Sequence, residues 1–227
     1  MLLLSLPCQA QKRARKMVEQ KDSTALFRGV AVNVDLMGPV QMLVSDYGVL
    51  EASLRVNLKD RYFPVFEVGL GKANSTEEST GLTYKTSAPY ARIGCDFNLL
   101  RNKHDIYRLY GGARYGLTYY KYDVSSPDLT DPIWGGTAAY GATGVSCNYH
   151  WMEVVLGVDA KLWGPVRLGW TLRYKRQLFH KEGDIGNTCY VPGYGKKGGS
   201  RFGGTVNLTF ELGGWKKNNN KESKVTK

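Results

Sequence analysis

Residues 50–58 have the sequence LEASLRVNL, in which apolar side chains alternate with polar or charged ones. Successive side chains of a β-strand point to opposite faces, so this period of two predicts a strand with one apolar and one polar face. An alternation of this length is hard to obtain by chance. The segment therefore indicates an all-β fold and sets the pattern for which the rest of the chain is searched.

The same alternation recurs in residues 26–36, 66–70, 91–99, 106–121, 152–162, 166–175 and 205–212. Long connections (37–48, 72–87, 123–147 and 179–201) alternate with short ones. Small outer-membrane barrels combine segments of about ten alternating residues with long external loops and short periplasmic turns. We predict an eight-stranded antiparallel up-and-down transmembrane β-barrel in the outer membrane of a Gram-negative bacterium, with both termini in the periplasm.

The polar faces of these segments carry acids and bases in similar numbers, together with many of the glycines. An eight-stranded lumen is only wide enough for side chains to fill it, and an unpaired buried charge is costly. A balanced set of charges therefore suits a packed, ion-paired lumen, in which glycines make room for long side chains. We expect this network to contain Glu51, Arg55, Glu67, Arg92, Asp96, Arg108, Arg114, Glu153, Asp159, Lys161, Arg167, Arg173, Lys175 and Glu211.

A lipocalin-like soluble barrel is the alternative fold, with the apolar face inside and the charged face in water. The aromatic residues argue against it, because several lie toward the strand ends of the apolar face, as in the girdles of membrane barrels. These residues are Tyr107, Tyr119, Trp170, Tyr174 and Phe210. The apolar faces are therefore predicted to meet lipid.

The two ends of the chain differ from the barrel segment, residues 26–212. Residues 1–10, MLLLSLPCQA, are similar to the end of a secretory signal, and their apolar run is far too short for a membrane-spanning helix. Basic tails at 11–25 and 213–227 carry a good part of the net charge of +11. Elsewhere Lys and Arg alternate with acids along the strands, so the charge does not indicate nucleic-acid binding.

Several short motifs carry a family resemblance. They are VNLKD (56–60), TSAPY (86–90), GCDFNLL (94–100), DIYRLYGG (105–112), SPDLTDP (126–132) and VPGYG (191–195). Over residues 26–212 the chain resembles a domain-of-unknown-function family of small Gram-negative outer-membrane β-barrels. The resemblance implies a fold and a location but no activity.

Two features of the predicted external loops leave alternatives open. Cys147 and Cys189 fall at the same end of the barrel, where an oxidising envelope permits a disulfide; the alternative is two unpaired thiols. The last long loop is basic, which suits either contact with lipopolysaccharide phosphates or simple solvation. The residues concerned are Arg176, His180, Lys181, Lys196, Lys197 and Arg201.

The sequence offers no convincing catalytic constellation, and we expect no catalytic residues, metal or cofactor. His150 with Ser146 or Glu153 is the candidate for a lipid A-modifying enzyme, but a converging acid, base and nucleophile is missing. A narrow channel needs an open lumen, which the charged side chains are expected to fill. We therefore favour a structural or accessory barrel that meets outer-membrane lipid and lipopolysaccharide and docks another envelope protein or lipoprotein.

Overall fold

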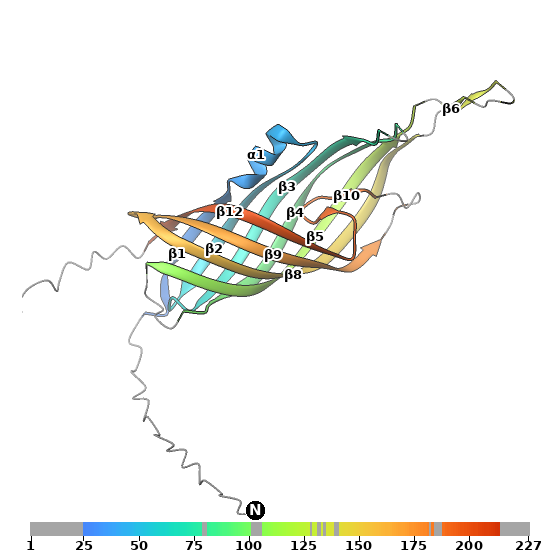
Figure 1. Cartoon of the computed structure of the whole chain (residues 1–227). Coiled ribbons are helices and arrows are strands. Elements are labelled where there is room, and N and C mark those ends of the chain that lie inside the picture. Colours follow the sequence, from blue (N-terminus) through green and yellow to red (C-terminus); the bar gives the residue numbers. More distant parts are fainter. Residues whose placement is uncertain are drawn as a thin grey trace, which may run out of the picture.

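The computed structural model describes residues 25–78, 81–100, 106–127, 129–130, 133, 135–138, 141–181, 183 and 188–213. Eight long strands form a closed antiparallel barrel, in which each strand pairs with the next and the last pairs with the first (Figure 1). They are β1 (Phe27–Asp35), β2 (Tyr47–Leu58), β3 (Tyr62–Thr76), β4 (Thr83–Asn98), β5 (Tyr107–Ser125), β8 (Gly141–Trp163), β9 (Val166–Lys181) and β12 (Ser200–Leu212). The predicted eight-stranded barrel is confirmed.

The apolar faces point outward and the charged faces point inward. On β2, Leu54 is 44% exposed whereas its neighbour Arg55 is 7% exposed, and on β8 Val154 is 61% exposed whereas Glu153 is fully buried. Such a belt of exposed aliphatic side chains is unfavourable in water and favourable in lipid. The barrel is therefore of the membrane-spanning type, and the lipocalin-like alternative is wrong.

The described ends of the chain and the short turns share one end of the barrel. The Lys59 amide donates to the Leu26 carbonyl beside the start of β1, and the Glu211 amide donates to the Pro165 carbonyl at the end of β12. The longer connections after β5 and β9 lie at the opposite end (Figure 1). We call these two ends the turn end and the loop end.

Several strands reach further toward the loop end than the alternation predicted. Between β3 and β4 only residues 77–82 remain outside the sheet, so the expected long loop at 72–87 is wrong. This connection is no longer than residues 99–106 at the turn end, and the predicted strict alternation of long and short connections fails there. The alternation of apolar and polar residues stops here because the strands leave the apolar belt. Lys72 and Asn74 are outward-facing residues of β3, but both are polar.

The first long connection contains a helix, α1 (Met37–Val44), where a loop was expected. The Asp35 carboxylate starts it by accepting hydrogen bonds of 3.0 Å from the backbone amides of Met37 and Gly38. Gly38 is buried against the Val49 carbonyl of β2. The helix thus lies on the outside of the wall (Figure 1), with Leu43 86% exposed. Among the described residues, no helix is long and apolar enough to cross a membrane.

Candidate functional site: the filled lumen

The middle of the lumen is occupied by buried arginines and carboxylates from different strands. Arg92 of β4 contacts Glu51 of β2, lies 2.8 Å from Glu67 of β3 and 2.9 Å from Glu153 of β8. Arg173 of β9 lies 3.0 Å from Glu51 and 3.1 Å from Glu67. Each carboxylate is shared by at least two arginines, since Glu153 also lies 3.5 Å from Arg173, and the ion pairs join β2, β3, β4, β8 and β9.

The network continues toward the turn end without a break. Arg114 lies 2.9 Å from Asp96 and also contacts Glu67 in the middle layer. Arg55 joins Asp96 to Asp159, at 3.3 Å from each. Together these pairs link strands β2, β3, β4, β5 and β8 into one buried layer.

The last pairs close the turn end. Arg167 lies 2.6 Å from Asp159, and Arg108 lies 2.8 Å from Glu211. Asp60 lies 3.1 Å from Arg28, although the sequence indicated only a turn there. Every charged residue predicted to line the lumen takes part in this network except Lys161, which is exposed near the end of β8. Lys161 lies beyond the reach of the packed interior, at the rim.

Aromatic rings add to the stabilisation of the buried guanidinium groups. The Arg55 guanidinium carbon lies 4.5 Å from the centre of the Tyr110 ring, and the Arg92 carbon lies 5.0 Å from that of Tyr90. Cation–π contacts of this kind are stronger when the cation is desolvated. The Tyr90 hydroxyl also donates a 2.8 Å hydrogen bond to Glu51, so the charged layer is joined directly to the aromatic residues above it.

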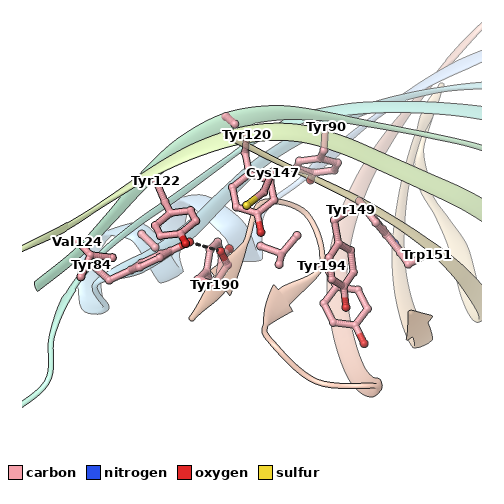
Figure 2. Packing of buried hydrophobic residues seen from close by; sticks show 13 residues of the cluster. Tyr84, Tyr90, Tyr120, Tyr122, Val124, Cys147, Tyr149, Trp151, Tyr190 and Tyr194 are labelled. Carbon is pink, nitrogen blue, oxygen red and sulfur yellow. Dashed lines mark hydrogen bonds between the residues drawn. The ribbon is translucent and has the colours of Figure 1, made fainter. Parts of the chain in front are cut away.

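The loop-end half of the lumen is aromatic rather than charged. Figure 2 shows the cluster, which combines wall residues of β3, β4, β5 and β8 with a segment between β9 and β12. Its members are Ala73, Tyr84, Ala88, Tyr90, Tyr120, Tyr122, Val124, Cys147, Tyr149, Trp151, Tyr190, Val191 and Tyr194. This layer was not predicted, because the strands expected from the sequence stop short of the loop end. The signal was present: Tyr84 and Tyr90 share the inward parity of Arg92, and Trp151 shares that of Glu153.

Glycines on the lumen face make room both for rings and for charged side chains. A Cβ atom at Gly116 would overlap the Trp151 indole, and one at Gly157 would overlap the Tyr110 ring. The expected role of these glycines, making room for charged side chains, applies to Gly94, Gly112 and Gly169, where a Cβ atom would meet Arg114, Asp96 and Asp159. Large side chains packed against glycines of neighbouring strands therefore fill the narrow interior of the barrel.

A short hairpin folds back into the loop-end half of the lumen. Strands β10 (Tyr190–Val191) and β11 (Gly195–Lys196) pair across a tight turn, and Val191 is fully buried. The Tyr84 hydroxyl donates a 2.7 Å hydrogen bond to the Tyr190 carbonyl (Figure 2), and burial raises the pKa of the Tyr190 hydroxyl to about 12. We call residues 188–199 the plug segment.

The plug segment is also attached to the charged layer. Lys175 donates a 2.6 Å hydrogen bond to the Gly193 carbonyl while its ammonium lies 3.7 Å from Glu153. The Tyr194 ring packs 4.8 Å from that of Tyr149, with its hydroxyl bonded to the Gly198 carbonyl. The two layers and the plug segment therefore form one continuous filling.

The residues predicted to contact lipopolysaccharide lie on β9, on β12 and in the plug segment. Lys196 is held 5.4 Å over the Tyr47 ring, and the Arg201 guanidinium donates a 3.4 Å hydrogen bond to the Lys196 carbonyl. Arg176 lies opposite Ser200, the neighbour of Arg201. The His180 ring lies 5.0 Å from that of Tyr149, and Lys181 and Lys197 are exposed. Contact of this group with lipopolysaccharide stays a prediction.

The three cysteines of the described residues, Cys95, Cys147 and Cys189, are free thiols, and the Cys147–Cys189 disulfide that the sequence allowed is not formed. Cys147 is buried, and its sulfur accepts a 3.2 Å hydrogen bond from the Gly183 amide. Thr188 accepts a hydrogen bond from Tyr120 inside the lumen, whereas the next residue, Cys189, is exposed. The two thiols therefore differ in environment, Cys147 lying in the buried aromatic cluster and Cys189 at the surface.

The residues considered for a lipid-modifying site are separated by the wall. His150 faces outward, where its Nδ1 lies 2.8 Å from the Tyr115 hydroxyl, whereas Glu153 is buried in the lumen. Ser146 and His150 lie opposite different residues of β5, Lys121 and Leu117 respectively. The three side chains do not converge.

A family model described as domain of unknown function DUF6048 matches residues 1–212. The chain belongs to the DUF6048 family. This confirms the resemblance stated from the motifs, and the family description assigns no activity. No curated protein matches the sequence.

Three solved structures are similar to most of the chain at low sequence identity. Neisserial surface protein A (NspA) is 13% identical with a TM-score of 0.42, over 83% of this chain and 98% of that one. CarO2 of Acinetobacter baumannii is 12% identical with a TM-score of 0.41, over 83% and 100%. Ail, the attachment invasion locus protein of Yersinia pestis, is 9% identical with a TM-score of 0.36, over 81% and 93%. These likenesses concern the general architecture.

Replacing Arg114 with leucine should lower the free energy of unfolding by about 3 kcal/mol, because Glu67 and Asp96 lose a buried partner. Lys161→Leu, which removes an exposed charge, is the control and should change stability by less than about 0.5 kcal/mol. Equilibrium unfolding in denaturant from lipid vesicles measures both. Equal effects of the two changes would contradict the ion-paired lumen.

Proposed function

We propose that the protein is a non-conducting barrel of the Gram-negative outer membrane that serves as a structural or accessory component and docks another envelope protein or lipoprotein. The observation that carries this proposal is the filling of the lumen. Ion pairs occupy its middle and turn end, and aromatic rings with the plug segment occupy its loop end. A barrel closed in this way offers its surfaces, rather than its interior, for function.

The belt of exposed apolar side chains supports the membrane location, and the topology supports the orientation. Short turns and the described chain ends share the turn end, as expected if this end faces the periplasm. The loop end then faces outward. The predicted signal at residues 1–10 and the basic tails, except for their end residues 25 and 213, lie outside the described residues.

The hairpin of β6 (Leu129–Thr130) and β7 (Thr137–Ala138) supports docking at the loop end. It projects beyond the wall of the barrel (Figure 1), and Ile133 between its strands is 81% exposed. An exposed aliphatic side chain on a projecting hairpin is suited to bury itself in a partner protein. We propose this hairpin as the docking element.

Purified protein in planar bilayers should show negligible conductance, because the two layers of the lumen leave no continuous water path. Replacing the plug segment with a short glycine–serine linker should leave the bilayer silent, since the charged layer still closes the barrel. Sustained ohmic steps from the wild-type protein would contradict the proposal and favour a narrow channel.

A photo-crosslinking amino acid at position 133 should capture one protein in stoichiometric amount, in the outer-membrane fraction of a density gradient. The same amino acid at Lys161, exposed at the turn end, is the control and should not capture that protein. Capture of the same protein from both positions, or no capture at position 133, would contradict docking through this hairpin.

A further inference from the structure

An apolar groove of about 650 Å³ runs along the outside of the wall beside α1. Pro39 of the helix forms one side, and outward-facing residues of β2 to β5 form its floor. These floor residues include Leu50, Val68, Ala91 and Leu117. Almost no polar group is exposed in the groove, so a hydrocarbon chain can lie along it without covering unpaired polar atoms.

The next positions toward the loop end are polar and basic. In the strand register, Leu70 pairs with Pro89 in the apolar row, and two residues further along Lys72 pairs with Ser87. On the following strands, Lys121 pairs with Ser146, and Asn148 pairs with Lys181. The outer surface of the wall therefore changes from apolar to cationic between one outward-facing residue pair and the next.

The apolar groove and the polar surface are continuous. A hollow of about 510 Å³ lined by Lys121, Lys181, Ser146 and Asn148 shares Pro89 and Tyr119 with the apolar groove. A second polar hollow shares Ser87 and Lys121 with the first and adds Lys72 and Lys85. Together they form one amphipathic surface, which we call the wall site.

The two polar hollows are positively charged after their acids are counted. The acids that line the apolar groove are already engaged, Asp35 with the amides at the start of α1 and Glu51 with arginines of the lumen. Asp46 and Asp123 also line the hollow that contains Lys72 and Lys85. The Asp123 carboxylate accepts a 2.7 Å hydrogen bond from the Gly144 amide. The hollow around Lys121 and Lys181 has no acid among its lining residues within the described part of the chain. An anion is therefore best accommodated there.

We infer that the wall site binds lipid A, with an acyl chain in the groove beside α1 and the phosphorylated sugar headgroup across the lysines. The inference rests on the proposed outer-membrane location, which places the loop end in the lipopolysaccharide leaflet. Lys121 on β5 and Lys181 on β9 line the same hollow and are two strand positions apart, roughly 10 Å at the usual strand spacing. Two separate cations at this distance suit a headgroup with two phosphates better than a single phosphodiester.

The hydroxyl and amide groups fit the same ligand. Ser87, Ser146 and Asn148 lie between the lysines and offer hydrogen-bond donors and acceptors to sugar hydroxyls. Tyr119 lies at the junction of the two regions and is 64% exposed. Tyrosine prefers this level of a membrane, where one end of the ring is apolar and the other is wet.

The test compares two double variants with the same change in charge. Lys121→Glu with Lys181→Glu alters the wall site, whereas Arg61→Glu with Lys161→Glu alters exposed residues at the turn end. Each purified barrel is placed in nanodiscs of neutral phospholipid doped with lipid A. Native mass spectrometry then measures how much lipid A stays bound after the disc is dissociated.

Retention of lipid A should fall about thirtyfold in the wall-site variant, the change that corresponds to about 2 kcal/mol for the loss of two lysines near phosphates. The turn-end variant should change by less than about twofold, since its charges lie well beyond the screening length. Ala91→Phe, which fills the groove, should also reduce retention, unlike Ala113→Phe elsewhere on the outer wall.

Equal retention by the two double variants would overturn the inference. So would equal retention of phosphatidylglycerol and lipid A by the wild-type barrel, which would show a general anionic surface. Because these measurements use purified protein, a negative result is distinct from a failure of the docking proposal, which is measured in cells.

Discussion

The structure depends on the requirement that charges buried in a narrow barrel be paired. Arg92 and Arg173 have no access to water, and each meets more than one carboxylate from another strand. Taking such groups from water is costly, and the cost is offset only when every charge has a well-placed partner. Because the partners come from different strands, the network forms only when the barrel is closed and in register. The network thus specifies the register as well as filling the interior.

The two ends of the lumen are closed by different kinds of side chain. Toward the turn end, the ion pairs continue to Asp60 at the rim. Toward the loop end, the strands continue beyond the apolar belt. There the lumen is filled by aromatic rings and the plug segment instead of charges, and Lys175 connects the plug segment to the charged layer. With the interior occupied, the surfaces left for function are the projecting β6–β7 hairpin and the outer wall. The proposed docking and lipid A site use these two surfaces.

The sequence predicted the barrel and its charged layer because both follow from a period-two pattern and a balance of charge, as in residues 50–58. It did not predict α1, which depends on the Asp35 carboxylate and a close contact of Gly38 with β2. The plug segment could not be predicted either, because a loop of aromatic and glycine residues has no periodicity that distinguishes buried from exposed positions. The aromatic layer, in contrast, could have been predicted by extending the strand parity to Tyr84 and Trp151.

Lipid is expected to contact the outward-facing apolar side chains and to be absent from the filled lumen. Quenching of single-tryptophan variants by brominated phospholipids tests this most directly, because bromine quenches only a tryptophan that it touches. Trp170 on the outer wall is 55% exposed, whereas Trp151 in the lumen is fully buried. We expect strong quenching of the fluorescence of the variant that keeps only Trp170, and no quenching for the variant that keeps only Trp151. Quenching of Trp151 with Trp170 unaffected would contradict it.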